Sequence, residues 1–346
     1  MTAVISQSLY PVQAVERRFW HGNRYHCVSA KVTLAFDDQG RLSQTERQPP
    51  MALDEVWHGT PMRSSLRHPG DLIPYKPVTD LLVTGTARPP GGRAVAAWDA
   101  SIGFQGRSKR LRLTGPRAWE HRLVSGWTLG DPSPTDGVAL LYENAFGGVD
   151  DPARATFEDG EFHPANPFGT GFVGRRRPDT DRVIPAPQIE AFNGAVGALG
   201  KPVAVGGLGP IPGFFPDRAR HMGTWDGLQP DQGMPLDMDM HYWNCAPADQ
   251  QADGHLREGD EIELRGLAGV ESLVIAMPGF TAMTVAHFTD GPDQATTMRL
   301  DTVEVDLDRR TLGLRYHRIV AVDERMERIS VHCAPHRPLS GERLHG

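Results

Sequence analysis

The segment Asp237-Met238-Asp239-Met240-His241 holds the residue types best suited to binding a metal ion. On an extended backbone alternate side chains point the same way, so Asp237, Asp239 and His241 would share one side. Two carboxylates and an imidazole can ligate one divalent cation. The spacing also fits an ordinary strand whose other face buries Met238 and Met240. A metal-dependent hydrolase or toxin using these three polar residues is therefore one hypothesis, and a plain strand is its alternative.

Other catalytic and cofactor motifs are incomplete. Gly194 to Lys201 is similar to a phosphate-binding loop, but five residues separate Gly194 from Gly200 where four are required. Pro202 also stands where a Ser or Thr should contact magnesium. Ser64-Ser65 lacks the flanking glycines of a nucleophile elbow, and the three cysteines are far apart in the chain. We therefore expect no cofactor and a protein that is not an enzyme.

A charged segment with two prolines runs from Asp71 to Asp80. Pro74 and Pro77 disfavour helix and hold the backbone extended. Charges on a stiff, extended segment, such as Asp71, Lys76 and Asp80, suit an ion-pair clamp to a neighbouring loop, or a docking edge. Lys76 could act as a catalytic base only if it were buried among apolar groups.

Composition narrows the class of protein. The chain has 346 residues, with 36 Lys+Arg against 43 Asp+Glu and a formal net charge of −7. This balance lacks the basic footprint of a nucleic-acid-binding protein. The apolar run from Leu273 to Met277 is far shorter than the roughly 20 residues of a membrane span, and the first residues do not fit a signal peptide. We expect a cytoplasmic protein without membrane insertion.

Apolar residues recur with a period of two in several segments, which is typical of half-buried strands. The clearest segments are 25–36, 297–307 and 311–322, and the alternation slips near Asp301 and Thr302. Further short strands are expected at 80–87, 94–102, 108–114, 137–142, 260–267 and 270–276. With 38 Gly and 29 Pro, the sequence predicts a mainly β fold. Its core would be an antiparallel sandwich or barrel-like unit, with few short helices, such as 188–199 and 247–255.

The chain divides into three parts that we expect to share one compact, two-lobed unit. Residues 1–142 form a β-rich part, 143–260 a loop-rich middle packed on the same core, and 261–346 the C-terminal hairpins and tail. The middle is rich in Gly, Pro and aromatic residues, which fits ordered loops held by aromatic anchors or a recognition surface. Candidate partner-binding residues, which could equally be core, are Tyr75, Lys76, Phe146, Phe168, Phe214, Trp225 and Trp243.

Several segments, in order, resemble a known bacterial family. The segments Arg63–Arg67 and Asp71–Gly85 are similar to the signature of the domain of unknown function 2169 family. Two departures are Cys245, where a small residue such as Ala is expected, and Gly207-Leu208, in place of a pair containing an aromatic residue. Further matching segments are Tyr142–Gly148, Asn166–Phe172, Gly207–Pro210, Gly223–Asp226, Pro235–Asp239, Asn244–Gln250 and Leu300–Val303.

The resemblance implies a role in protein delivery, because members of this family are encoded with type VI secretion genes. It implies an adaptor or chaperone that binds an effector in the cytoplasm and promotes its loading onto the spike, through VgrG or a PAAR-type tip protein. A third hypothesis is a structural component of the secretion apparatus.

Overall fold

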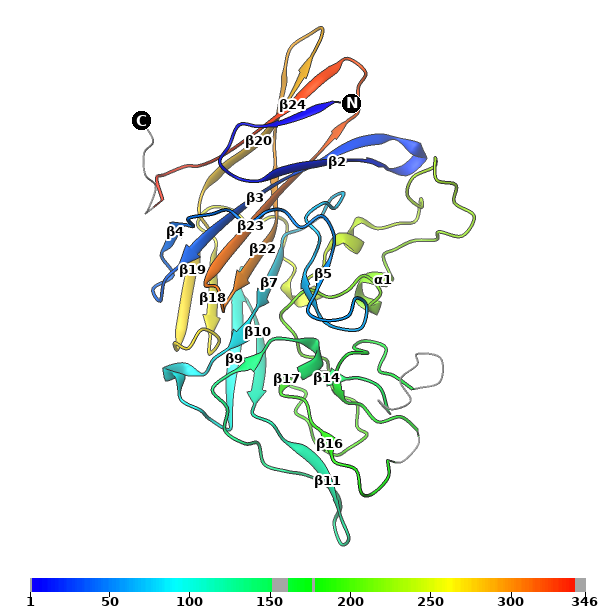
Figure 1. Cartoon of the computed structure of the whole chain (residues 1–346), viewed down its shortest axis with the longest axis vertical. Helices are drawn as coiled ribbons and strands as arrows, with labels where there is room; N and C mark the ends of the chain where they lie inside the picture. The colour runs from blue at the N-terminus through cyan, green and yellow to red at the C-terminus, as the bar shows by residue number, and fades with distance from the viewer. Residues whose placement is uncertain (1, 151–160, 176–177, 340–346) are drawn as a thin grey trace.

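The computed structural model describes residues 2–150, 161–175 and 178–339. The chain forms an elongated molecule built from β-strands and long loops (Figure 1). Most strand pairs are antiparallel, so the prediction of a mainly β, antiparallel fold is confirmed.

The largest sheet has six strands in the order β2-β3-β23-β22-β7, with β4 paired to the far end of β3. Its strands come from both ends of the chain, and β22 and β7 run parallel. Their bounds are β2 Val12–Arg18, β3 Arg24–Phe36, β4 Leu42–Gln44, β7 Asp80–Thr84, β22 Arg299–Asp306 and β23 Thr311–Ala321.

Two further sheets complete the core. The four-stranded sheet contains β1 Ala3–Ser6, β24 Met326–Pro335, β20 Phe280–Phe288 and β21 Gln294–Thr297. The five-stranded sheet contains β17 Ile189–Ala191, β10 Arg107–Thr114, β9 Ala97–Phe104, β18 Glu261–Arg265 and β19 Ser272–Ala276. Apolar side chains of all three sheets form one continuous hydrophobic core.

Smaller sheets of two or three strands form outside the three large sheets. A three-stranded sheet contains β12 Gly126–Leu129, β11 Ala118–Arg122 and β16 Ile184–Pro185. The two-stranded pairs are β5 Val56–Trp57 with β6 Leu66–His68, β8 Thr86–Ala87 with β13 Val138–Ala139, and β14 Phe146–Gly147 with β15 Thr170–Gly171.

Helices are few and short. The α-helix α1 spans Pro216–Ala219, and single 3-10 turns span Trp20–Gly22, Pro90–Gly92, Tyr142–Asn144, Met240–Trp243 and Ala248–Gln250. No helix in the described ranges has the length and apolarity needed to cross a membrane.

The predicted helix at 188–199 is wrong. Residues Ile189–Ala191 form strand β17, which pairs with β10, and the following residues form turns. Backbone hydrogen bonds to a neighbouring strand, with Ile189 buried in the core, outweigh the weak local preference for helix. Of the predicted helix at 247–255, only the 3-10 turn Ala248–Gln250 forms.

The slip in alternation predicted near Asp301 is a β-bulge. On β22, Leu300 pairs with Tyr316 and Thr302 pairs with Arg315, so Asp301 is the additional residue. The bulge lets Leu300 and Val303 enter the core while Asp301 and Thr302 both face Arg315 on the other side of the sheet.

Candidate functional site

A row of polar side chains crosses the six-stranded sheet on the face opposite the hydrophobic core. The strand register places Lys31 beside Arg315, Arg315 beside Thr302, and Thr302 beside Asp80. On the same strands, the neighbouring residues Val32, Leu314 and others point into the core. The period of two thus separates an apolar face from a polar face on each strand.

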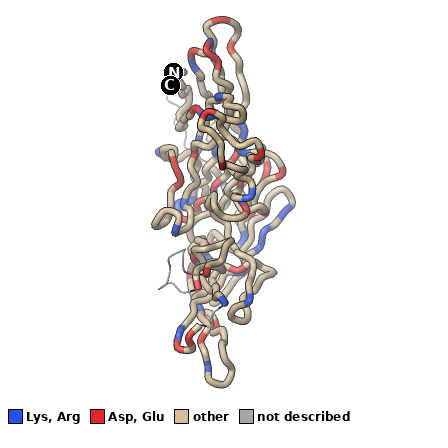
Figure 2. Tube along the Cα trace, turned by 90° about the vertical axis from the view of Figure 1, so that its right-hand side faces the viewer, with Lys and Arg blue, Asp and Glu red and all other residues tan. Residues whose placement is uncertain are grey.

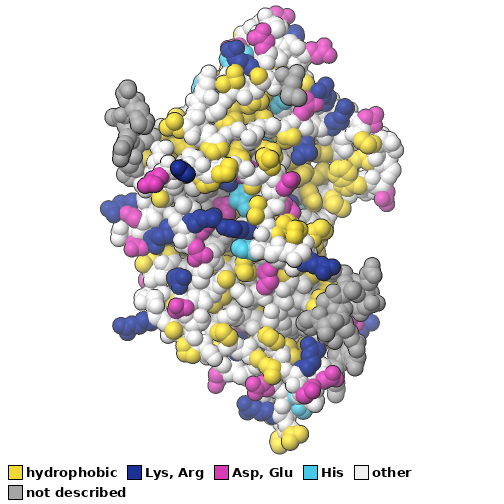
Figure 3. All heavy atoms as spheres, in the orientation of Figure 1, with side chains coloured by type: hydrophobic (Ala, Val, Ile, Leu, Met, Phe, Trp, Pro, Cys, Tyr) yellow, Lys and Arg dark blue, Asp and Glu magenta, His cyan; other side chains and the backbone are white. Residues whose placement is uncertain are grey.

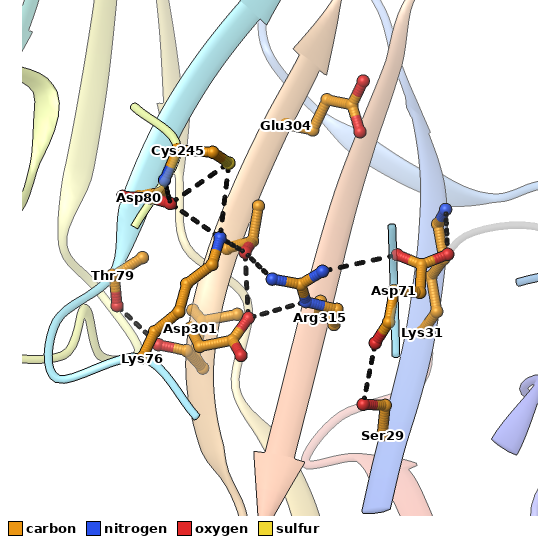
Figure 4. A network of polar contacts seen from close by, with 12 residues as sticks. Ser29, Lys31, Asp71, Lys76, Thr79, Asp80, Cys245, Asp301, Glu304 and Arg315 are labelled. Carbon is orange, nitrogen blue, oxygen red and sulfur yellow. Dashed lines mark hydrogen bonds and ion pairs between the residues drawn. The ribbon is translucent and has the colours of Figure 1, made fainter. Parts of the chain in front are cut away.

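The segment 71–80 lies over this row and completes it with Asp71 and Lys76 (Figure 4). We call the resulting group the polar clamp. Each of its cations is paired with at least one acid: Arg315 lies between Asp71 and Asp301, Lys31 pairs with Asp71, and Lys76 pairs with Asp80. The members are Lys31, Asp71, Lys76, Asp80, Asp301, Thr302 and Arg315.

Arg315 is the centre of the polar clamp. Its Nε donates to Oδ1 of Asp301 at 2.8 Å, and its Nη2 donates to Oγ1 of Thr302 at 2.7 Å. Its Nη1 donates to the carbonyl of Gly70 at 2.8 Å and lies 3.7 Å from Oδ1 of Asp71. The guanidinium therefore ties the sheet to the segment that begins at Asp71.

Lys76 fills the other half of the polar clamp. Its Nζ donates to Oδ2 of Asp80 at 2.6 Å and to Oγ1 of Thr302 at 2.8 Å, and it lies 3.5 Å from Sγ of Cys245. Asp80 also accepts from the Nδ2 of Asn244 and from the backbone N–H of Cys245. The segment from Asn244 is thereby fixed over strand β7.

Electrostatics favour the ionised forms of two acids of the polar clamp, Asp301 and Asp71. Burial by itself would raise the pKa of Asp301, but the charges of Arg315 and Lys76 outweigh it, and the pKa is lowered. The pKa of Asp71 is lowered in the same way. Burial alone would raise it, but the effects of Lys31, His68 and Arg315 are larger. Removing one partner of a buried ion pair leaves the other charge buried and unpaired, which strongly destabilises the folded protein. The polar clamp is therefore a structural element.

Segment 71–80 forms ion pairs as expected, but their partners outside the segment, Lys31 and Arg315, lie on strands β3 and β23 and not on a neighbouring loop. Lys76 is only 1% exposed, and its ammonium is held by Asp80 and Thr302. Burial among polar partners of opposite charge does not create the apolar surroundings that a catalytic lysine requires.

A cleft of about 490 Å³ opens above the polar clamp. Lys76, Cys245 and Arg315 lie at its buried floor, and their charged groups are engaged with one another and with the acids. The walls are largely apolar: Leu53, Trp57, Pro61, Met62, Leu72, Ile73 and Trp243. Such a cavity with a polar floor has the size and lining of a binding site.

Exposed apolar side chains surround the mouth of this cleft. Leu53 and Met62 are each 61% exposed, although they have large side chains. Trp57 stacks on Phe214 with ring centroids 6.4 Å apart and an interplanar angle of 10°, and Phe214 is also exposed. We call Leu53, Trp57, Met62 and Phe214 the apolar rim. An exposed cluster of this kind is characteristic of interaction surfaces.

Three of the matching sequence segments hold the apolar rim in place. The backbone N–H of Ser65 donates to Oε1 of Glu143 at 2.8 Å, and the Ser65 hydroxyl bonds to the same carboxylate. This contact anchors the hairpin of β5 and β6, which carries Trp57. The Nδ2 of Asn166 donates to the carbonyls of Tyr142 and Phe146. It fixes the turn that places Phe168 against Phe214.

The three predicted metal ligands do not converge. The segment is not an extended strand, because Met240–Trp243 is a 3-10 turn whose N-cap is Asp239. Asp239 accepts from the backbone N–H of His241 and contacts the Nδ1 atoms of His241 and His221. Asp237 accepts from the N–H and the hydroxyl of Thr224 instead. In the described ranges, no three His, Cys, Asp or Glu side chains are grouped to hold a metal ion.

The predicted partner-binding residues are distributed between core and surface. Lys76 and Phe146 are buried, and Tyr75, Phe168 and Trp243 are half-buried. Phe214 and Trp225 are exposed. Phe214 belongs to the apolar rim, whereas Trp225 lies on a separate loop, where its Nε1 donates to the carbonyl of Met222.

Sequence reasoning missed Leu53, Trp57 and Met62. They lie in a stretch without periodicity, and their shared position depends on contacts with residues far along the chain. The available indication was the Arg63–Arg67 motif that directly follows them.

The chain was compared with known proteins. No curated protein and no solved structure has significant similarity to it. A family model described as "Uncharacterized protein conserved in bacteria (DUF2169)" matches residues 21–317, which include the polar clamp and the walls of the cleft. The chain therefore belongs to the DUF2169 family of uncharacterized proteins conserved in bacteria.

Proposed function

We propose that this protein is a type VI secretion adaptor and chaperone that binds an effector in the cytoplasm and promotes its loading onto the VgrG or PAAR-type spike. The resemblance described above suggests the pathway. The observation that carries the binding role is the apolar rim, where Leu53 and Met62 are each 61% exposed beside the stacked Trp57 and Phe214.

The apolar rim favours a protein ligand with an apolar segment. Burying apolar surface contributes about 25 cal/mol per Å², and aromatic residues are frequent energetic centres of interfaces. The cations at the floor are balanced by Asp71, Asp80 and Asp301, so the floor offers no unpaired charge to an ionic ligand. Basic and acidic residues are interspersed along the coloured part of the trace in Figure 2.

A stable complex needs more contact than the cleft alone. Specific interfaces bury about 1,000 Å² or more, so the cleft would form the centre of a larger contact. Figure 3 shows further apolar side chains on the face around the loops near β5 and α1. An effector whose apolar surface packs against this region would no longer expose that surface, so it would be less prone to aggregate.

The test is co-expression with an effector encoded beside the gene for this protein. We expect the soluble yield of the effector to rise and the two proteins to co-purify. Addition of purified VgrG or PAAR-type protein should then give a ternary complex on a sizing column. The proposal fails if neither the effector nor a spike protein binds. High abundance in sheared sheath or spike preparations would instead favour a structural component.

A further inference from the structure

The hairpin formed by β11 and β12 ends in two fully exposed aliphatic side chains. Leu123 and Val124 are 100% and 101% exposed. The turn closes through the pair Arg122 and Gly126, and Gly126 takes a positive φ of 68°, which suits glycine. Figure 1 places this hairpin at the lower end of the molecule, and apolar side chains lie at the same end in Figure 3.

This tip does not serve the stability of its own chain. Tight turns usually carry polar residues or glycine, because their side chains remain in water. Glu120 and Arg122 beside the tip are also exposed, and neither has an ion-pair partner in the described part of the chain. The hairpin thus presents an apolar knob flanked by one free acid and one free base.

The cleft above the polar clamp has the complementary features. Its walls are apolar, and its volume of about 490 Å³ exceeds that of two aliphatic side chains. Its lining includes one base and one acid, Arg17 and Asp54, which have no ion-pair partner among the described residues. The tip cannot reach the cleft of its own chain, because the hairpin points away from β5 in Figure 1.

We propose that the Leu123–Val124 tip of one copy enters the cleft of a second copy. Arg122 then faces Asp54, and Glu120 faces Arg17. The contact joins two different surfaces, so its repetition can build chains or rings of copies. A knob of two side chains buries far less than the about 1,000 Å² of a stable interface, so the contact is weak and exchanges readily.

The biological meaning of this contact rests on the function proposed above. The tip would occupy the cleft that we assign to the effector, and an effector would displace it. Self-contact would cover part of the apolar rim part of the time when no effector is present, and effector binding would release single copies.

The experiment is sedimentation velocity of the full chain over a range of micromolar concentrations. We expect the mean mass of the wild-type protein to rise with concentration. The tip variant Leu123→Ser/Val124→Ser and the cleft variant Leu53→Ser/Met62→Ser should each remain monomeric. An equal mixture of the two variants should stop at a dimer, because only one intact tip and one intact cleft remain in each pair. Leu9→Ser, a matched change of another exposed leucine, should assemble like wild type.

Three outcomes would overturn the inference. They are a wild-type protein that stays monomeric throughout, a tip variant that assembles like wild type, and mixed variants that form long chains. If the wild-type protein stays monomeric but its tip binds phosphatidylcholine vesicles, a membrane contact replaces the self-contact. Effector pull-downs with the tip variant separate the self-contact from the proposed function. If the tip variant still binds the effector but the wild-type protein does not assemble, only the self-contact is rejected.

Discussion

The ammonium of Lys76 lies 2.6 Å from Oδ2 of Asp80, and both side chains are withdrawn from solvent. Only three residues separate the two, and Pro77 is among them, so the pair closes a tight bend just before strand β7. The bend returns the chain to the sheet and forms part of the cleft floor. Packing of the cleft and pairing of the buried charges are therefore coupled.

Replacing Lys76 by Met should destabilise the protein by about 3–5 kcal/mol, because Asp80 would remain buried without its cation. Chemical denaturation followed by fluorescence measures this loss. Lys201→Met, at an exposed lysine, should change stability by less than about 0.5 kcal/mol. The double variant Lys76→Met/Asp80→Asn should recover part of the loss. A single variant that unfolds like wild type would show that the pair contributes little.

The pH dependence of stability should contain a contribution from His317. Burial lowers its pKa to about 4, in surroundings that include Asp301, Arg315, Lys76 and the backbone of Ile73. Between about pH 6.5 and 4, His317 is protonated in the unfolded chain but neutral in the folded chain. Stability should therefore fall by roughly 3 kcal/mol as the pH decreases through this window.

His317→Gln should remove the part of the slope that His317 contributes, whereas His21→Gln, at an exposed position, should leave the slope unchanged. The rest of the slope comes from other buried or half-buried histidines whose pKa values burial also lowers, namely His26, His58, His68, His163 and His255. Asp71 and Asp301 have lowered pKa values, so their contribution is retained above the ordinary carboxyl range and lost only in stronger acid. Unfolding free energies measured at several pH values separate the two effects. An unchanged slope in His317→Gln would contradict this assignment.

The three cysteines should be unreactive in the folded protein. Burial raises the pKa of Cys27 and Cys333 to about 12 and that of Cys245 to about 11. Fewer than about one thiol in a thousand is then ionised at neutral pH, and only the thiolate is nucleophilic. Titration with a disulfide reagent should detect none rapidly in buffer and three in denaturant. A fast-reacting native thiol would contradict the buried position of all three.

The strands were predictable where the alternation had one apolar and one polar face. Segment 25–36 shows this pattern, because residues 28–34 alternate between the hydrophobic core and the polar face of the sheet. The bulge at Asp301 was also visible as a slip in the pattern. In contrast, the helix expected at 188–199 was wrong, since pairing of Ile189 with Leu113 is a contact between distant residues.

The polar clamp was predictable only in part. The charges and prolines of segment 71–80 indicated ion pairing, but nothing in the local sequence indicated that Arg315 and Asp301 would be the partners. The apolar rim was even harder to predict from the sequence. Leu53, Trp57 and Met62 come together through Ser65, which is held by Glu143 from a distant loop. Such a surface depends on tertiary contacts and leaves no periodic pattern in the chain.

Changes in the apolar rim should weaken effector binding without unfolding the protein. Leu53→Ser/Met62→Ser removes two exposed apolar side chains, so thermal stability should remain within the range of ordinary surface substitutions. If the effector buries both, each loss costs about 1.5–3 kcal/mol, and affinity should fall by about a hundredfold or more. Calorimetry with purified effector measures the change. Leu236→Ser, at an exposed leucine outside the cleft lining, is the matched control and should bind like wild type. Equal affinities for wild type and the rim variant would place the effector on another face.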